Sequence, residues 1–419
     1  MIKFRSIIAM TLCFVIAICC ASCGSDKPEN TNVSQKAYNT AFVEKTTAEP
    51  NTFTQATTTT GEIVDNTPVD RTGPRPFFKQ DYMMRSITTK QLLSQLGSGV
   101  TLGNSLCANG LGTGKTNREY EEFYGNPAIT KELINSYKKQ GFCAVRLPVS
   151  WTDHMDENGN VDSLWLDRVE EIVNYCLDFD LYCIINSQND NTWLTTSDVG
   201  FSKTKQKFSA MWKSIANRFK DYNDYVLFEG VSEPLKANND KSAPSEKDIK
   251  NANALNQAFV NAVRSTGGNN SKRHLVVSTY GSFVDSASLS GFKLPKDSVK
   301  NRICAKVNVY IPSAFCFDEN TALNWGKQGE KQYLTTVLQV INQRFSALKI
   351  PVIIGEFGAI DKGNESARTA YSAHLVSTAY DYYMVCFWND NGSNMRLIDR
   401  ATCEPVFSRL TQSIVNNAN

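Results

Sequence analysis

The sequence predicts an α/β fold in the form of a (β/α)8 TIM barrel. Eight short apolar segments that favour strands recur over about 340 residues, and amphipathic segments that favour helices separate them. Eight parallel strands with helices between them are the number that closes such a barrel. An open, doubly wound sheet is the alternative, but no Gly-rich dinucleotide fingerprint follows the first strand.

The expected elements follow one another in a regular order. Thr88 or Thr89 caps a short helix that ends near Gly97, just before the first strand. The expected strands cover residues 100–102, 144–147, 182–186, 226–229, 275–278, 304–309, 352–355 and 384–387. The expected helices between them include residues 128–139, 165–179, 203–219, 251–266, 330–348 and 366–382.

The N-terminus is expected to be a targeting segment. Lys3 and Arg5 precede an apolar run that is too short for a comfortable membrane span, and small residues then precede Cys23. This pattern is typical of a lipoprotein-type signal peptide over residues 1–23, with Cys23 as the lipidated residue, although Cys20 stands where a Leu is usual. Ordinary secretion and a retained anchor are the alternatives.

The remaining chain divides into a spacer and a folded module. Residues 24–75 are rich in Thr, Asn and Ser with few large apolar side chains, which predicts a disordered linker. Residues 76–416 are expected to form the barrel. The protein is therefore expected to be exported and held at the cell surface or the outer face of a membrane by a lipid, with no other membrane contact; secretion is the alternative.

Composition excludes several classes of function. Lys and Arg total 44 and Asp and Glu total 42, so the chain is nearly neutral. It lacks the excess of positive charge that would favour nucleic acid as a partner. The chain has three His, and the eight cysteines after the signal region form no C-x-x-C pair, so a metal site is not expected. The eight cysteines after the signal region are expected to be buried, small apolar residues. One or two disulfides among them are the alternative.

Two glutamates at strand ends indicate a catalytic pair of carboxyl groups. Glu233 follows the fourth expected strand, and Glu356 follows the seventh. Strands four and seven lie on opposite sides of a barrel, so their carboxyl ends place both side chains at one opening. Cleavage of a glycosidic bond with retention requires such a pair, about 5–5.5 Å apart. For either Glu alone, a structural role in capping a strand or pairing with a basic residue is the favoured interpretation, whereas the two together favour catalysis.

Other polar and aromatic side chains are expected around this opening. Glu229 lies four residues before Glu233 and should point the same way but deeper, where it needs a partner such as Arg146, which could equally serve the nucleophile. Trp388 is the aromatic side chain that we expect to stack on a sugar. The further residues expected at the opening are Asn104, Gln188, Ser232, Tyr310, Trp193 and Trp325.

The chain resembles glycoside hydrolase family 5, in particular its endo-β-1,4-glucanase and xyloglucanase branch. The resemblance covers about residues 88–410 and depends on the order of seven motifs, at residues 102–105 (LGNS), 124–127 (YGNP), 141–151 (GFCAVRLPVSW), 168–175 (RVEEIVNY), 228–234 (FEGVSEP), 351–359 (PVIIGEFGA) and 387–392 (FWNDNG). It implies a retaining hydrolase of β-1,4-linked glucans or related plant polysaccharides. Glu233 would be the acid/base and Glu356 the nucleophile, with no cofactor and with a monomeric protein acting on a β-glycan.

The resemblance also shows departures at the sugar-binding opening. Arg146, Tyr310 and Trp388 have counterparts in the family, but three other residues differ. Gln188 and Asn308 stand where the family has His, and Ser232 stands where it has Asn. These changes leave a second hypothesis open, a weak or inactive glycan-binding pseudoenzyme at the cell surface. Transglycosylation and a purely structural adhesion role are further alternatives, and the glycan itself stays open among cellulose, mixed-linkage glucan, xyloglucan, mannan and xylan.

Overall fold

The computed structural model describes residues 84–112 and 114–418. The predicted signal segment with Cys23, the linker over residues 24–75 and the first residues of the predicted module lie outside this range. Within it, no helix combines the length and apolar character needed to cross a membrane.

Eight parallel strands form a closed barrel, as predicted. Each strand pairs with the next along the chain, and β1 pairs with β8 to close the ring. The barrel strands are β1 (Gly99–Leu102), β2 (Ala144–Leu147), β3 (Tyr182–Ile185), β4 (Val226–Glu229), β5 (Leu275–Ser278), β6 (Ile303–Val309), β7 (Val352–Phe357) and β8 (Val385–Asp390). A small antiparallel pair, β9 (Ile398–Asp399) and β10 (Glu404–Pro405), follows β8.

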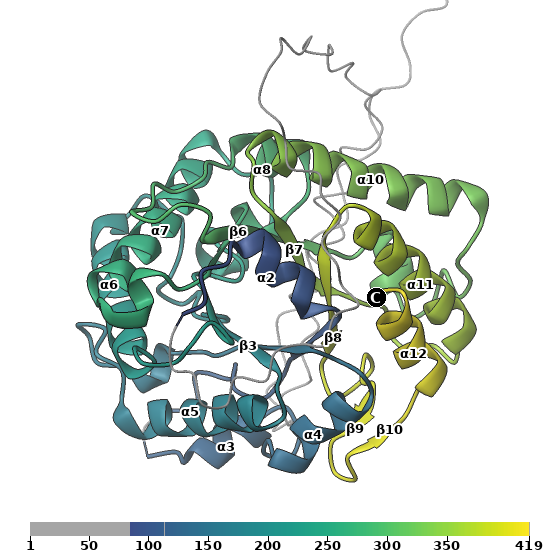
Figure 1. Ribbon diagram of the computed structural model, residues 1–419, viewed down its shortest axis with the longest axis horizontal. Helices are drawn as coiled ribbons and strands as arrows, with labels where there is room; N and C mark the ends of the chain where they lie inside the picture. The colour runs from purple at the N-terminus through teal and green to yellow at the C-terminus, as the bar shows by residue number, and fades with distance from the viewer. Residues whose placement is uncertain (1–83, 113, 419) are drawn as a thin grey trace, which may run out of the picture. The chain divides into compact units, whose positions relative to one another are not determined.

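Helices surround the strands (Figure 1). Their order alternates with that of the strands, and the six expected between strands are all present, although the one expected from residue 251 begins five residues earlier. The α-helices are α2 (Thr89–Leu96), α3 (Asn117–Glu122), α4 (Lys131–Lys139), α5 (Ser163–Asp178), α6 (Phe201–Arg218), α7 (Glu246–Ser265), α8 (Ser286–Gly291), α9 (Ser313–Phe317), α10 (Gln328–Ala347), α11 (Glu365–Asp381) and α12 (Ser408–Asn416).

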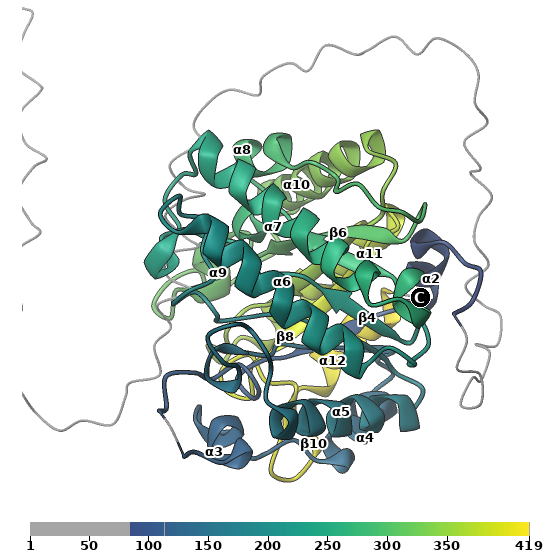
Figure 2. The ribbon, with the colours of Figure 1, turned by 90° about the vertical axis from the view of Figure 1, so that its left-hand side faces the viewer.

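Helix α2 covers one end of the barrel. Thr88 caps it in a reciprocal capping box with Gln91, as the sequence predicted for this position. Its buried side chains Leu92, Leu93 and Leu96 pack with the apolar residues at the amino ends of the strands. Figure 2 shows α2 and α9, which follows the carboxyl end of β6, on opposite sides of the barrel. The end of the barrel away from α2, where the strands have their carboxyl ends, is therefore the one available for a functional site.

The inside of the barrel changes character along its axis. Near α2 the inward side chains are apolar, such as Ala144, Ile184 and Cys304. Two residues further along most of the strands, the inward positions are polar or charged, as at Arg146, Glu229 and Lys306, all of them fully buried. Since a strand turns alternate side chains to the same face, the strand sequences themselves set up this polar layer beneath the opening.

The outward side chains form the main core between strands and helices. Trp165 of α5 and Trp212 of α6 are fully buried in it. Seven of the eight described cysteines are buried, Cys403 is partly exposed, and all eight are free thiols. They therefore serve as small apolar residues in this structure.

Candidate active site

Arg146, at the end of β2, is the centre of the polar layer. Its guanidinium is fully buried and donates to both carboxylate oxygens of Glu229, with Nε–Oε2 at 2.6 Å and Nη2–Oε1 at 2.7 Å. It also donates from Nη1 to Oε1 of Glu356 at 2.9 Å and from Nη2 to the hydroxyl of Ser232 at 2.8 Å. The sequence left open which carboxylate Arg146 would serve, and the structure shows that it serves both.

Glu229 is held as a carboxylate deep in the barrel. Burial alone would raise its pKa, but the charges of Arg146 and Lys306, together with hydrogen bonds from Arg146 and Asn186, bring its pKa below the ordinary value. Its oxygens are fully engaged by Arg146 in a bidentate pair. Glu229 therefore orients Arg146 and is not itself exposed to a ligand.

Glu356 owes its position to an irregularity in β7. The pairing of β6 with β7 matches Val307 to Ile354 and then Asn308 to Glu356, so Gly355 is an extra residue. This bulge turns Glu356 into the barrel directly after the inward Gly355. There Arg146 holds Oε1, and the Tyr310 hydroxyl donates to Oε2 at 3.1 Å. Both oxygens are thus fixed while the residue stays 6% exposed.

Glu233 lies closer to solvent, with its side chain 22% exposed. Asn308 donates from Nδ2 to its Oε1 at 3.1 Å, and Lys241 places its ammonium 3.6 Å from Oε2. Glu233 also lines a pocket with Gln188 and Ser232 between the loops that follow β3 and β4. A carboxyl that reaches this pocket can exchange a proton with a bound molecule or with water.

Ser232 and Asn308 contact the groups around them inside the polar layer. Ser232 is 1% exposed and lines the pocket beside Glu233, and its hydroxyl accepts from Arg146 and from Lys306. Asn308 is fully buried and contacts Glu233. Burial closes Asn308 to a sugar in this structure, which corrects the expectation for that residue; contact of Ser232 with a sugar stays a prediction.

Trp388 is the clearest correction to the sequence analysis. β8 extends three residues beyond its predicted end, so Trp388 lies inside the strand. Phe387 points into the barrel, and the strand alternation turns Trp388 outward. It is fully buried, its indole N–H donates to the carbonyl of Met395 at 2.8 Å, and its ring packs against Phe357. It offers no open ring face to a sugar.

Asn389 takes the inward position at the end of β8. Its amide donates to the Tyr310 hydroxyl at 2.9 Å, so it fixes the tyrosine that contacts Glu356. It is only partly buried. The sequence analysis missed Asn389 and also Lys306 and Lys241. Alternation along a longer β8, and the shared face of residues 306, 308 and 310, are the signals that could have found the first two.

The remaining predicted residues are spread over the loops. Gln188 accepts from Asn186 at 3.3 Å and lines the pocket beside Glu233. Asn104 follows β1 with a positive φ of 54° and is partly exposed. Trp193 is also partly exposed, with Lys207 over its ring at 5.0 Å. Trp325 is 8% exposed and packs on Tyr371 of α11, so the structure does not bring it to the opening.

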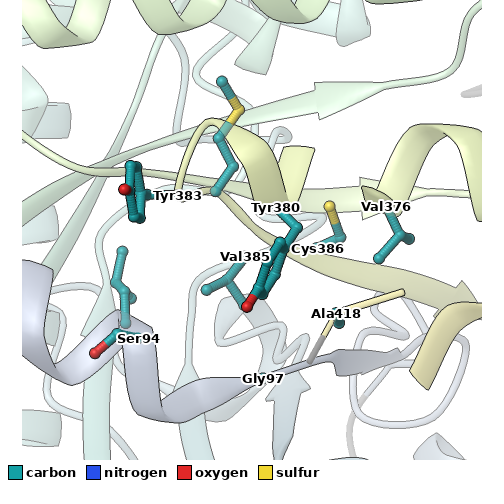
Figure 3. A pocket seen from close by; sticks show the side chains of 10 residues that line it. Ser94, Gly97, Val376, Tyr380, Tyr383, Val385, Cys386 and Ala418 are labelled. Atoms are coloured by element: carbon teal, nitrogen blue, oxygen red, sulfur yellow. The ribbon is translucent and has the colours of Figure 1, made fainter. Parts of the chain in front are cut away.

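A small pocket lies at the other end of the barrel. Figure 3 shows it between Ser94 and Gly97 near α2, Tyr380 and Tyr383 near the end of α11, and residues of β8. It is next to none of the residues around Glu233 and Glu356. Among the described residues, no group of three or more His, Cys, Asp or Glu side chains could hold a metal ion.

Comparisons with known proteins agree with this geometry. Residues 108–395 match the family model described as Cellulase (glycosyl hydrolase family 5). The Cellulase/esterase CelE of Acetivibrio thermocellus is 35% identical over 352 residues, which is 80% of this chain but only 41% of that protein. The Xyloglucan-specific endo-beta-1,4-glucanase BoGH5A of Bacteroides ovatus is 33% identical, over 80% of this chain and 71% of that protein.

A solved structure is similar over the whole barrel. The GH5-4 broad specificity endoglucanase from Ruminococcus champanellensis with bound cellotriose has a TM-score of 0.76 and 34% identity. The match covers 79% of this chain and 99% of that chain. At this level of identity the similarity extends beyond the fold to the family.

The buried pair of Arg146 and Glu229 predicts a specific pH dependence of stability. Glu229→Gln should lower the free energy of unfolding by about 3–5 kcal/mol at pH 7, because it leaves a buried cation without its bidentate partner. Since the folded pKa of Glu229 is lowered from the ordinary 4.5, its stabilising contribution is complete above that pH and is lost as the pH falls through the folded value. The deficit of the variant should therefore shrink below pH 4.5.

Denaturant titrations of both proteins between pH 3 and pH 7 measure this difference. Glu122→Gln is the matched control, because Glu122 forms an exposed ion pair with Arg118 and should lose little at any pH. A deficit for Glu229→Gln that stays constant down to pH 3 would contradict the assignment of an ionised Glu229.

Proposed function

The chain belongs to glycosyl hydrolase family 5, whose members hydrolyse O-glycosyl bonds, and from this membership we propose that it is a retaining hydrolase of β-1,4-linked glucans or related plant polysaccharides. One observation carries the proposal. Arg146 donates to Glu356 and to Ser232, the residue directly before Glu233, so one buried guanidinium holds the first glutamate directly and the second through its neighbour in the chain. Such preorganised contacts are what positions two carboxyl groups for catalysis.

In the first step Glu233 acts as the acid and Glu356 as the nucleophile. The Glu233 carboxyl gives its proton to the glycosidic oxygen as the bond to the anomeric carbon breaks. A Glu356 oxygen attacks that carbon and forms a covalent glycosyl ester. Arg146 and Tyr310 hold the Glu356 oxygens in place for this attack, and Asn308 orients Glu233.

In the second step the ester is hydrolysed. Glu233, now a carboxylate, takes a proton from water while the water oxygen attacks the anomeric carbon. The bond to Glu356 breaks, and its carboxylate returns to Arg146 and Tyr310. Two displacements at one carbon leave the configuration of the sugar unchanged. The 22% exposure of Glu233 suits this exchange of protons with water.

The names of the relatives support the choice of substrate. One relative is described as a xyloglucan-specific endo-β-1,4-glucanase, and a similar solved structure holds cellotriose. A β-1,4-linked glucose backbone is common to both. We therefore propose this backbone as the substrate class. The loops that carry Asn104, Gln188 and Trp193 would decide which sugar branches on the backbone are accepted.

A second function, glycan binding with little turnover, has one observation in its favour. Trp388 faces the core and so does not reach the opening where a sugar would be held, and the Ser232 hydroxyl is already shared by Arg146 and Lys306. Loss of one preorganised transition-state contact can lower a rate by about 10²–10³-fold. A hydrolase with slow turnover and a pure binder are separated by the following measurement.

Glu356→Gln should lower turnover of soluble β-glycans by at least ~10³-fold, because an amide cannot form the glycosyl ester. Reducing-end release from β-glucan, xyloglucan, mannan and xylan measures this, with calorimetric binding of cello-oligosaccharides measured beside it. Glu132→Gln is the control, since Glu132 lies on the outer helix α4. Equal binding by wild type and Glu356→Gln, with product release by neither, would favour the binder.

We propose in addition that the protein is exported and anchored at the cell surface by a lipid on Cys23, with residues 24–75 as a spacer. The charged start, the apolar run and the small residues before Cys23 support this. In a bacterial host, Cys23→Ser should leave the N-terminus without a lipid and release the protein from the membrane fraction. Cell fractionation with mass spectrometry of the N-terminal peptide measures both effects. An unmodified Cys23 on a wild-type protein that stays in the membrane would instead favour an uncleaved anchor.

A further inference from the structure

Lys306 is a fully buried cation in the middle of the polar layer, and nothing said so far about the chemistry uses it. It lies on β6, two residues before Asn308. Its Nζ donates to the carbonyl of Ser232 at 3.1 Å, to the hydroxyl of Ser232 at 3.2 Å and to the hydroxyl of Ser282 at 3.0 Å. Burial of an ammonium group costs free energy, so its three hydrogen bonds to Ser232 and Ser282 indicate a role in holding these two residues.

The neighbouring strand leaves space for this side chain. A Cβ added at Gly355 would lie 2.4 Å from Cε and 2.8 Å from Cγ of Lys306. Gly355 is also the extra residue of the β7 bulge that turns Glu356 inward. One glycine therefore allows both the approach of Lys306 and the position of Glu356, which ties the two features together.

The contacts of Lys306 converge on the turn that carries Glu233. Ser232 directly precedes Glu233, and Lys306 holds both its carbonyl and its hydroxyl. The same hydroxyl accepts from Arg146, which holds Glu356. The backbone N–H of Ser232 is bound to the carbonyl of Ser187 at 2.9 Å, so Ser232 is fixed from three sides.

Lys306 lies among charged groups of both signs. Arg146 of β2 is the second cation, and Glu229, Glu233 and Glu356 are the carboxyl groups that face it; Glu229 is nearest, at 3.7 Å. Burial, then the charge of Arg146, lowers the pKa of Lys306 to about 8, against the opposing effect of these carboxyl groups. At neutral pH the side chain is therefore still largely an ammonium and can donate all three bonds.

We propose that Lys306 is a positioning residue for the hydrolysis: its ammonium fixes the turn of Ser232 and Glu233 so that the Glu233 carboxyl reaches the glycosidic oxygen. The proposal rests on the function proposed above. It also accounts for Ser at position 232, because a short hydroxyl side chain can share Arg146 and Lys306 as donors. Lys306 acts through Glu233 and does not touch the substrate.

Lys306→Met tests the proposal, because Met has a similar length but no charge and no donor. We expect kcat for a soluble β-glycan to fall by about 10²-fold, the loss typical of a misplacement near 1 Å, with KM changed by less than about threefold. Lys138→Met is the matched control: Lys138 also donates to a backbone carbonyl, that of Asp180, but it lies on α4. It should keep the wild-type kcat.

Crystal structures of wild type and Lys306→Met provide a readout that does not depend on turnover. The Ser232–Glu233 turn should shift or become disordered in the variant. An unchanged Glu233 position together with an unchanged kcat would overturn the proposal. If wild type releases no product, the proposed function fails, and the two crystal structures still decide whether Lys306 positions Glu233.

Stability against pH provides a third readout. The unfolded chain keeps the Lys306 proton up to about pH 10.5, but the folded protein loses it near pH 8. The free energy of unfolding of wild type should therefore rise relative to that of Lys306→Met between these pH values. Parallel curves would show that the pKa of Lys306 is not lowered in the folded protein, which contradicts the balance of burial and charge described above.

Ser282→Ala keeps the proposal testable if Lys306→Met does not fold. It removes one of the three acceptors and leaves the charge in place. We expect a smaller fall in kcat, about threefold to tenfold, in the direction seen when one positioning contact is lost. Wild-type kcat in Ser282→Ala, with Glu233 in its wild-type position, would count against the role of this cluster.

Discussion

The bidentate pair between Arg146 and Glu229 is the interaction on which the rest of the site depends. It lies at full burial beneath the opening, where ionised groups persist only when they are paired and hydrogen-bonded. With Glu229 fixing its plane, the guanidinium has donors left for Glu356 and Ser232. The two catalytic candidates are therefore placed by one rigid group that belongs to neither of their strands.

The barrel could be predicted because its evidence is local. Each apolar strand segment and each amphipathic helix can be recognised from a short stretch of the sequence. Eight such strands are the number that closes a barrel. The rule that polar groups collect at the carboxyl ends of strands then pointed to Arg146, Glu233, Tyr310 and Glu356. Arg146 and Tyr310 each contact Glu356, and Glu233 is linked to Arg146 through its neighbour Ser232.

The details of the site depended on pairing between strands, which the sequence does not display. The bulge at Gly355 arises only when β7 is laid against β6, and it decides the direction of Glu356. The true end of β8 decides that Trp388 faces the core and Asn389 the barrel. Lys306 was overlooked because a lysine within an apolar strand reads as an exception until its partners are seen.

The central claim is that Glu356 attacks the sugar, and trapping the glycosyl ester tests it most directly. A 2-deoxy-2-fluoro cellobioside with a good leaving group should form the ester quickly and hydrolyse it slowly. Mass spectrometry of the digested protein should then find one added disaccharide on the peptide that contains Glu356. An adduct on another carboxylate, or hydrolysis of β-glucan with inverted configuration and no adduct, would contradict the account.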